Sequence, residues 1–229
     1  MREIIFDTET TGFDPQNGDR LVEIGCIEMV NRVLTGATFH AYFNPERDMP
    51  AAAEAVHGLS SAFLADKPLF GSRAQEILDF IADSPLVAHN AGFDFGFLNA
   101  ELAMCGLPPV DKARMVDTVL IARAKHPGAK NSLDALCTRY GVDRSHRTKH
   151  GALLDAELLA QVYVELLGGR QIGLELAAEQ KAEGEAPRSE VTGTRQRILR
   201  PARPHAASEE ELAAHAAFLE TIKAPLWLT

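Results

Sequence analysis

Two acidic residues one position apart follow a short apolar run near the start of the chain, in the segment Ile4-Ile5-Phe6-Asp7-Thr8-Glu9. An apolar run of this length, ending at Gly12, predicts a buried β-strand whose period of two places Asp7 and Glu9 on one face. Neighbouring carboxylates repel each other, and oxygen ligands of this kind suit a divalent cation. The alternative is a strand end whose acidic side chains face solvent. This segment alone is compatible with both interpretations.

Two further acidic residues, Asp94 and Asp155, are predicted on the buried faces of helices, because apolar residues recur three and four positions away from them. The apolar stripes consist of Phe97, Leu98 and Cys105 for Asp94, and of Leu158, Leu159, Val162 and Leu166 for Asp155. An acid on an inward face needs a partner or a bound ion. For Asp94 an N-cap at the helix start is an equal alternative.

Two histidines lie close to these elements in the sequence. His150 is five residues before Asp155, about 140° away around an ideal helix, so it must approach Asp155 from the preceding loop. A lone histidine is more often a surface residue, and only the neighbouring acid favours a role in chemistry. His57 precedes Gly58, a pattern that favours a helix-end residue over a ligand.

Together these residues predict one reaction class. Four carboxylates, Asp7, Glu9, Asp94 and Asp155, match the charge of two Mg²⁺ or Mn²⁺ ions, and oxygen-only ligands argue against zinc or copper. Two such ions clamp the attacking and leaving oxygens of a phosphodiester. A histidine with an ordinary pKa, here His150, accepts a proton at neutral pH. The sequence therefore predicts metal-assisted phosphodiester hydrolysis.

The elements that must position these residues alternate between strands and helices. Strands are expected at residues 4–9, 21–30, 33–43, 86–88 and 115–116, with a hairpin at Asn31-Arg32. Helices are expected at residues 50–58, 72–81, 93–105, 119–124, 132–140 and 152–167, with Asp117 as a cap. The polar, basic segment from Asp143 to Lys149 predicts a mobile loop before His150.

Composition limits the protein class. The chain has 229 residues, 46% hydrophobic and 24% charged, with a formal net charge of -9. An acidic chain excludes nucleic-acid binding through a broad basic surface and favours local, metal-bridged contacts. Cys26, Cys105 and Cys137 are widely spaced among apolar neighbours, which predicts core residues in a reducing compartment. No apolar run reaches the roughly 18 residues of a membrane span, so we expect a cytoplasmic protein without membrane contact.

The composition changes after Gly169. Residues 181–207 are rich in Glu, Pro, Gly and Arg without periodicity, which indicates a linker. Ser208 and Glu211 then form a capping-box pattern before a helical stripe. The segment Pro225-Leu226-Trp227-Leu228 is apolar, and on a tether it favours docking to a partner over packing on its own domain.

Three separated motifs resemble those of the DEDDh 3′-to-5′ exonucleases: Phe6 to Gly12, His89 to Asp94, and His150 to Asp155. The resemblance covers residues 1–168 and implies an α/β, ribonuclease H-like fold with a mixed five-stranded sheet flanked by helices. It also implies two Mg²⁺ or Mn²⁺ ions and a general base. The implied metal ligands are Asp7, Glu9, Asp94 and Asp155, the implied base is His150, and the implied substrate contacts are Thr8, His57, Phe93, Asp7, Glu9 and Asp155.

Within this superfamily, the segments at residues 22–25, 31–32, 131–137 and 210–215 are similar to the proofreading subunits of bacterial DNA polymerase III. That similarity implies hydrolysis of mismatched nucleotides at the single-stranded 3′ end of primer DNA, releasing nucleoside 5′-monophosphates. It implies an exonuclease domain at 1–168, a flexible linker at 169–207, and docking of residues 208–229 to the polymerase (alpha) subunit. Residues 171–176 are similar to a sliding-clamp peptide. The alternatives are a free-standing exonuclease, a trimming ribonuclease or a non-catalytic tethering subunit.

Overall fold

The computed structural model describes residues 1–147, 149–169 and 207–222. The chain divides into two compact units, residues 1–176 and 177–229. The elements of the first unit, in chain order, are β1 (Arg2–Thr10), η1 (Pro15–Asn17), β2 (Leu21–Val30), β3 (Val33–Tyr42), α1 (Ala51–His57), α2 (Ser61–Leu64), α3 (Phe70–Ile81), β4 (Leu86–Ala88), α4 (Ala91–Met104), η2 (Lys112–Arg114), β5 (Met115–Asp117), α5 (Thr118–Lys125), α6 (Leu133–Tyr140) and α7 (Ala152–Leu166). The second unit contains α8 (Glu209–Glu220).

The five strands of the first unit form one mixed sheet in the order β3-β2-β1-β4-β5. β2 pairs antiparallel with β1 and with β3, whereas β4 is parallel to β1 and to β5. β1 is therefore the central strand, and its carboxyl end lies at the same edge as the ends of β4 and β5. This arrangement confirms the predicted α/β class and the mixed five-stranded sheet.

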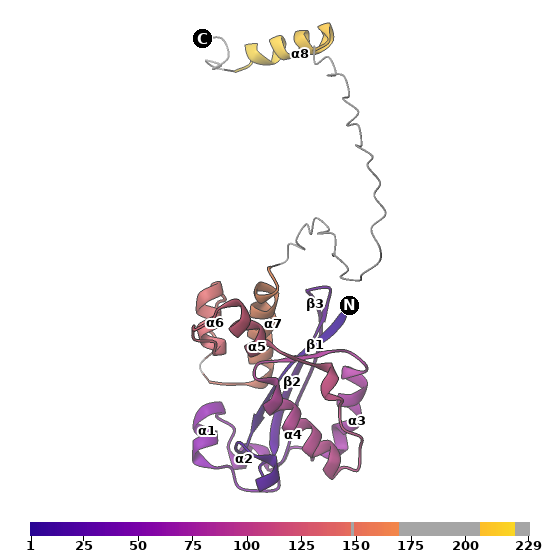
Figure 1. Cartoon of the computed structure of the whole chain (residues 1–229), viewed down its shortest axis with the longest axis vertical. Coiled ribbons are helices and arrows are strands. Elements are labelled where there is room, and N and C mark those ends of the chain that lie inside the picture. Colours follow the sequence, from indigo (N-terminus) through magenta and orange to yellow (C-terminus); the bar gives the residue numbers. More distant parts are fainter. Residues whose placement is uncertain (148, 170–206, 223–229) are drawn as a thin grey trace, which may run out of the picture. The chain divides into compact units, whose positions relative to one another are not determined.

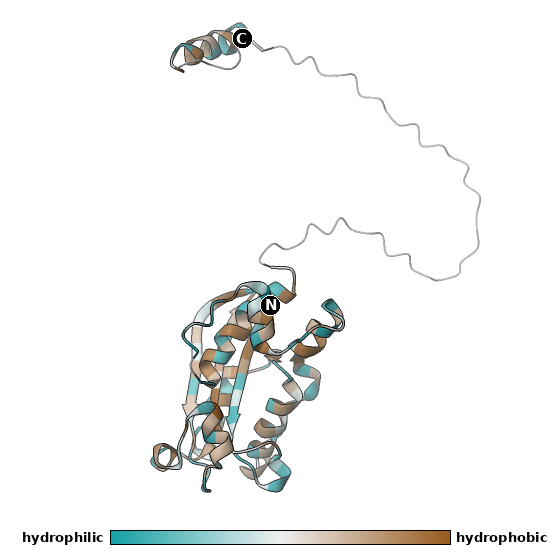
Figure 2. Ribbon diagram, turned by 90° about the vertical axis from the view of Figure 1, so that its left-hand side faces the viewer, coloured by the Kyte–Doolittle hydropathy of each residue, from teal (hydrophilic) through white to brown (hydrophobic). Residues whose placement is uncertain are grey.

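Helices cover both faces of the sheet, with α3 and α4 on one side and α5, α6 and α7 on the other (Figure 1). β1 serves both cores because its side chains alternate: Ile4 and Phe6 pack with α3 and α4, and Ile5 packs with α7. Along these helices hydrophobic and hydrophilic segments alternate (Figure 2), as expected for helices with one buried face. Asp7 and Glu9 continue the face of Ile5, toward α7.

The β2–β3 hairpin turns through Asn31 and Arg32, with φ angles of 51° and 66°. Two residues with positive φ make the tight turn that matches strand twist, and asparagine tolerates this region better than most residues. The Arg32 guanidinium donates to the carbonyl oxygens of Leu167 and Gly169, at 3.3 and 3.4 Å. The predicted hairpin is confirmed, although its turn lacks the favoured glycine.

A buried ion pair connects α4 to the start of β2. Arg20 Nε and Nη2 donate to the two carboxylate oxygens of Glu101 at 2.8 and 2.9 Å, and the backbone N–H of Leu21 donates to Glu101 Oε1 at 3.1 Å. Glu101 is only 1% exposed. This contact fixes the helix that carries Asp94 against the sheet.

The predicted helices are all present, with shifted ends. α4 begins at Ala91, two residues before the expected start, because Asn90 takes a left-handed conformation (φ 67°) that turns the chain directly from β4 into the helix. Asp117 caps α5 through a 2.8 Å bond from Val119 N–H, as predicted. Cys26 and Cys137 are buried, but the prediction for Cys105 was wrong, because it follows the last turn of α4 and is exposed.

α8 begins with the predicted capping box. The Ser208 hydroxyl accepts from Glu211 N–H at 3.2 Å, and the Glu211 carboxylate accepts from Ser208 N–H at 2.8 Å. Leu212 and Phe218 on this helix are 57% and 61% exposed. The predicted linker at residues 169–207, apart from Gly169 and Ala207, lies outside the described residues, as do the predicted clamp peptide at 171–176 and the apolar residues 225–228. Among the described helices, none combines the length and the apolar character needed to cross a bilayer.

Candidate active site

Asp7 and Glu9 lie on the last part of β1 and point toward α7. Glu9 is 8% exposed, and its Oε1 has no hydrogen-bond partner within the described structure. Burial and the charge of Glu23, followed by those of Asp155 and Asp94, raise the pKa of Glu9 to about 8. Burial and the charges of Asp94, Glu9 and Asp155 hold the pKa of Asp7 well above its usual value. The positive charge near these carboxylates is therefore too small to offset their burial and mutual repulsion.

Asp94 lies in the first turn of α4 and is 3% exposed. Its Oδ1 accepts a 2.7 Å hydrogen bond from the Thr8 hydroxyl on β1. Burial raises the pKa of Asp94 to about 7, and the bond from Thr8 opposes part of that rise. Asp94 is therefore not a surface N-cap, since it faces inward and is oriented by the central strand.

Asp155 lies in the first turn of α7 and is also 3% exposed. α7 reaches the sheet at Gly25, which is the cross-strand partner of Asp7. A β-carbon on Gly25 would lie 2.3 Å from the backbone nitrogen of Leu153 and 2.5 Å from the carbonyl carbon of Ala152. Only glycine permits this contact, so the first turn of α7 rests directly on β2 beside Asp7.

Arg147, in the loop before α7, forms an ion pair with Asp155. Its Nε and Nη2 donate to Asp155 Oδ1 and Oδ2 at 2.5 and 2.6 Å, and its Nη1 donates to Asp134 Oδ1 at 2.8 Å. His150 Nδ1 lies 2.8 Å from Arg147 Nη2 and 3.2 Å from Asp155 Oδ2, with 48% of its side chain exposed. His150 thus reaches the site from a loop, as its sequence position predicts.

The structure brings Glu9, His150 and Asp155 together, with one potential ligand atom from each within 4.8 Å of the others. Asp7 and Asp94 lie outside this close group, but the charges of Asp94, Glu9 and Asp155 raise the pKa of Asp7, and the charge of Asp94 raises the pKa of Glu9. The four carboxylates carry about four negative charges when ionised, and Arg147 supplies one positive charge by direct contact. The unpartnered oxygen of Glu9 and the oxygen-only carboxylate set fit a hard divalent cation, since such ions prefer oxygen ligands.

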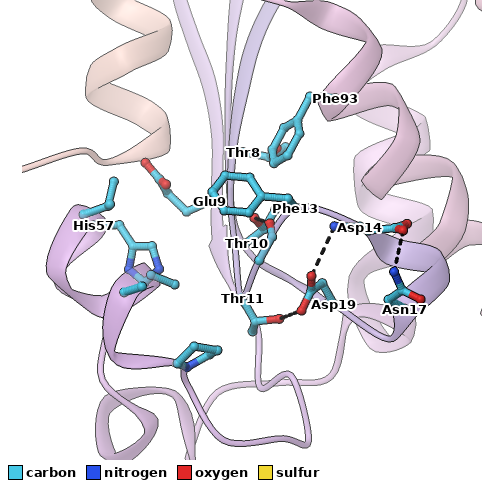
Figure 3. A pocket seen from close by; sticks show the side chains of 15 residues that line it. Thr8, Glu9, Thr10, Thr11, Phe13, Asp14, Asn17, Asp19, His57 and Phe93 are labelled. Atoms are coloured by element: carbon cyan, nitrogen blue, oxygen red, sulfur yellow. Dashed lines mark hydrogen bonds between the residues drawn. The ribbon is translucent and has the colours of Figure 1, made fainter.

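A pocket of about 420 Å³ opens beside Glu9, between the loop after β1 and helix α1. Figure 3 shows Glu9 and His57 on one side of this pocket and Asp14 and Asn17 on the other. His57 is 6% exposed, its Nδ1 accepts from Leu59 N–H at 3.0 Å, and its Nε2 has no partner within the described structure. Burial lowers the pKa of His57, which favours the neutral ring. His57 is the last residue of α1, as its position before Gly58 predicts, and it also lines the pocket.

Two phenylalanines also line this pocket. Phe93 is half-buried and packs on Phe97 with ring centroids 4.9 Å apart, whereas Phe13 is 90% exposed. Of the predicted substrate contacts, His57 and Phe93 therefore share one apolar pocket with Glu9. The Thr8 side chain is buried and bonded to Asp94, so it orients that carboxylate.

Sequence reasoning missed two charged residues of the site, Arg147 and Glu23. Arg147 was counted only as part of a polar, basic loop, and no periodicity marks an arginine there. Glu23 lies opposite Glu9 in the β1–β2 ladder. Its position in an otherwise apolar strand, Leu21-Val22-Glu23-Ile24, was a signal that could have identified it.

Comparison with known proteins gives a consistent set of relatives. A family model described as Exonuclease (RNase_T) matches residues 4–163. The DNA polymerase III subunit epsilon of Rickettsia conorii is 49% identical over 225 residues, covering 97% of this chain and 96% of the relative. The protein of the same name from Escherichia coli K12 is 43% identical over 232 residues, covering 97% of this chain and 93% of the relative. A solved structure of the nuclease domain of 3′hExo, a DEDDh family member bound to rAMP, has a TM-score of 0.63 at 18% identity and covers 73% of this chain and 92% of that one.

Proposed function

Since the chain belongs to the DNA polymerase III epsilon family of exonucleases, we propose that it is the 3′-to-5′ proofreading exonuclease subunit of a bacterial replicative polymerase, working in the cytoplasm. It removes mismatched nucleotides from the 3′ end of a DNA primer and releases nucleoside 5′-monophosphates. One observation supports hydrolysis most directly: the buried Glu9 carboxylate has an oxygen without a partner, beside Asp155 and His150.

We assign two Mg²⁺ or Mn²⁺ ions to this site, held by Asp7, Glu9, Asp94 and Asp155. The pKa values of Asp7, Glu9 and Asp94 are raised by burial and by mutual repulsion, which is the expected state of metal ligands without their cations. When bound, such ions neutralise charge on the phosphodiester and lower the pKa of water.

The side chains of the chain have separate tasks in this proposal. The Thr8 hydroxyl holds Asp94 in one orientation through its 2.7 Å bond. His150 accepts the proton of the attacking water, and its exposed position on a loop lets the proton pass to solvent. Because His150 is held by the loop before α7, its ring can move without displacing Asp155.

The terminal nucleotide occupies the pocket beside Glu9. Phe93 packs against its sugar or base, and the unpartnered His57 Nε2 bonds to it. A primer end that has unpaired from its template reaches such a pocket more easily than a paired one, because pairing must be broken first. This difference accounts for preferential removal of mismatches.

The second unit carries exposed apolar side chains on α8 that could bind another protein. We propose that residues 208–229 bind the polymerase subunit through the exposed apolar side chains of α8, including Leu212 and Phe218. We also propose that residues 169–207 act as the linker to this docking segment and that residues 171–176 bind the sliding clamp. The relatives named as polymerase III subunits support a polymerase partner.

The test is degradation of 5′-labelled primer-templates, with a matched or mismatched 3′ end, by the purified chain. We expect stepwise shortening from the 3′ end in Mg²⁺ or Mn²⁺, faster on the mismatch, and none in EDTA. Internal cuts, shortening from the 5′ end or activity in EDTA would contradict the proposal. RNA of the same length is the comparison substrate, and faster cleavage of RNA would favour a trimming ribonuclease.

A further inference from the structure

Arg147 is the cation that the described structure places in direct contact with the carboxylates of the site. Its side chain is 9% exposed, and its two-point contact with Asp155, at 2.5 and 2.6 Å, is the strongest geometry available to an arginine–carboxylate pair. Asp155 has both carboxylate oxygens occupied by this contact. A divalent cation that binds Asp155 therefore competes with Arg147 for the same oxygens.

Arg147 also contacts the ring of His150. Its Nη2 lies 2.8 Å from His150 Nδ1 and 3.3 Å from His150 Nε2, and His150 Nδ1 lies 3.2 Å from Asp155 Oδ2. A cation that displaces the guanidinium from Asp155 therefore also removes it from the ring of His150.

An alternative partner for Arg147 is already in place. Asp134 on α6 accepts from Arg147 Nη1 at 2.8 Å and forms an ion pair with Arg144, whose Nη1 lies 2.9 Å from the same oxygen. Asp134 is about half exposed. It can therefore still pair with the Arg147 guanidinium after the contact with Asp155 is broken, so that no buried charge is left unpaired. The guanidinium thus has one buried partner and one outer partner, on two different helices.

We propose that Arg147 is a positioning residue that takes the place of the divalent cation on Asp155, and that this cation displaces it toward Asp134 and away from His150. This inference rests on the proposed function. Metal binding and the departure of the guanidinium from the His150 ring are then one event.

The test is Mn²⁺ binding to the full chain by calorimetry, with Arg147→Gln and Arg147→Lys. Competition predicts that Arg147→Gln binds Mn²⁺ roughly tenfold more tightly than the original chain. Arg147→Lys keeps the charge but loses the two-point contact, so it should also bind more tightly, by roughly threefold. A purely electrostatic effect would leave Arg147→Lys unchanged, and a merely structural arginine would weaken Mn²⁺ binding when removed. Either result would overturn the proposal.

Arg144→Gln is the matched control, because Arg144 contacts Asp134 but not Asp155, and its Mn²⁺ affinity should stay within about twofold of the original. Nuclease assays add a second readout: the Mn²⁺ concentration that gives half-maximal cleavage should fall in Arg147→Gln by the same factor as the calorimetric dissociation constant. If the original chain bound no Mn²⁺, the proposed function itself would fail. An Mn²⁺ affinity that is unchanged in Arg147→Gln would refute the competition between Arg147 and the cation but not the proposed function.

Discussion

Glu9 and Glu23 are direct cross-strand partners in β1 and β2, and both are buried, with 8% and 3% exposure. Cross-strand partners project from the same face of a sheet, so Glu23 adds its charge to the site. After burial, it is the largest cause of the raised pKa of Glu9. The other side of Glu23 contacts His40 Nε2 at 2.7 Å. The site is thus more acidic than its four predicted ligands alone would make it.

The raised pKa values predict that the metal-free chain loses stability as the pH rises from about 6 to 8. The folded state keeps protons on Glu9 and Asp94, whose pKa values are about 8 and 7, whereas the unfolded chain releases them near pH 4. The folded state therefore binds more protons in this window, and rising pH favours unfolding. We expect the Tm in EDTA to fall by roughly 5 °C.

Thermal unfolding at pH 6, 7 and 8 checks this expectation. Glu9→Gln should flatten the pH profile, since a neutral amide has no proton to lose. Saturating Mn²⁺ should flatten it in the original chain as well, because bound cations replace the protons. A Tm in EDTA that rises across the window would contradict the assigned direction of both pKa shifts.

Asp7→Asn should remove activity without unfolding the chain. Asp7 is a proposed ligand at the centre of the carboxylates, so cleavage of a mismatched primer should fall at least roughly a thousandfold. The Tm in EDTA should rise by roughly 2–4 °C, because one repelling charge is gone. Asp143→Asn is the control, because Asp143 is an exposed aspartate. It should leave both the cleavage rate and the Tm unchanged.

His150→Gln should lower turnover by roughly 10²- to 10⁴-fold, the usual contribution of a general base. Mn²⁺ binding, measured by calorimetry, should remain, since the carboxylates carry the affinity. His146→Gln is the matched control, an exposed histidine four residues away in the same loop. Loss of Mn²⁺ binding in His150→Gln would make this histidine a ligand instead of a base, consistent with its closeness to Glu9 and Asp155.

Arg20→Met should destabilise the chain by roughly 3–5 kcal/mol, because Glu101 would keep a buried charge without its partner. Chemical denaturation measures this directly. Arg73→Met, which breaks an exposed pair with Glu76, should cost less than about 1 kcal/mol. Equal effects of the two substitutions would show that Glu101 gains little from Arg20.

Deletion of residues 208–229 should leave nuclease activity intact and remove association with the polymerase subunit. α8 has no buried residue, so its loss exposes no core. Co-elution of the purified polymerase subunit with the full or shortened chain is the measurement. Leu212→Ser with Phe218→Ser should have the same effect as the deletion, and persistent co-elution of the shortened chain would refute the assigned docking segment.

The sequence predicted the strands, the caps and the positions of the acids because each has a local signal. Alternation marks β1, Asp117 and Ser208 mark helix starts, and apolar stripes identify Asp155 as buried. Arg147 could not be predicted, since its role depends on α6 and α7 meeting in space. Cys105 was misplaced because apolar neighbours at a helix end resemble a core pattern although the last turn extends beyond the core.

The contact between Gly25 and the first turn of α7 has a consequence for how this enzyme can change over time. The spacing between β2 and the first turn of α7, which carries Asp155, is set by contact between main-chain atoms. Apolar side chains elsewhere between α7 and the sheet take no part in this contact. The position of Asp155 relative to β2 therefore depends on Gly25, the position in this contact where no side chain can be added.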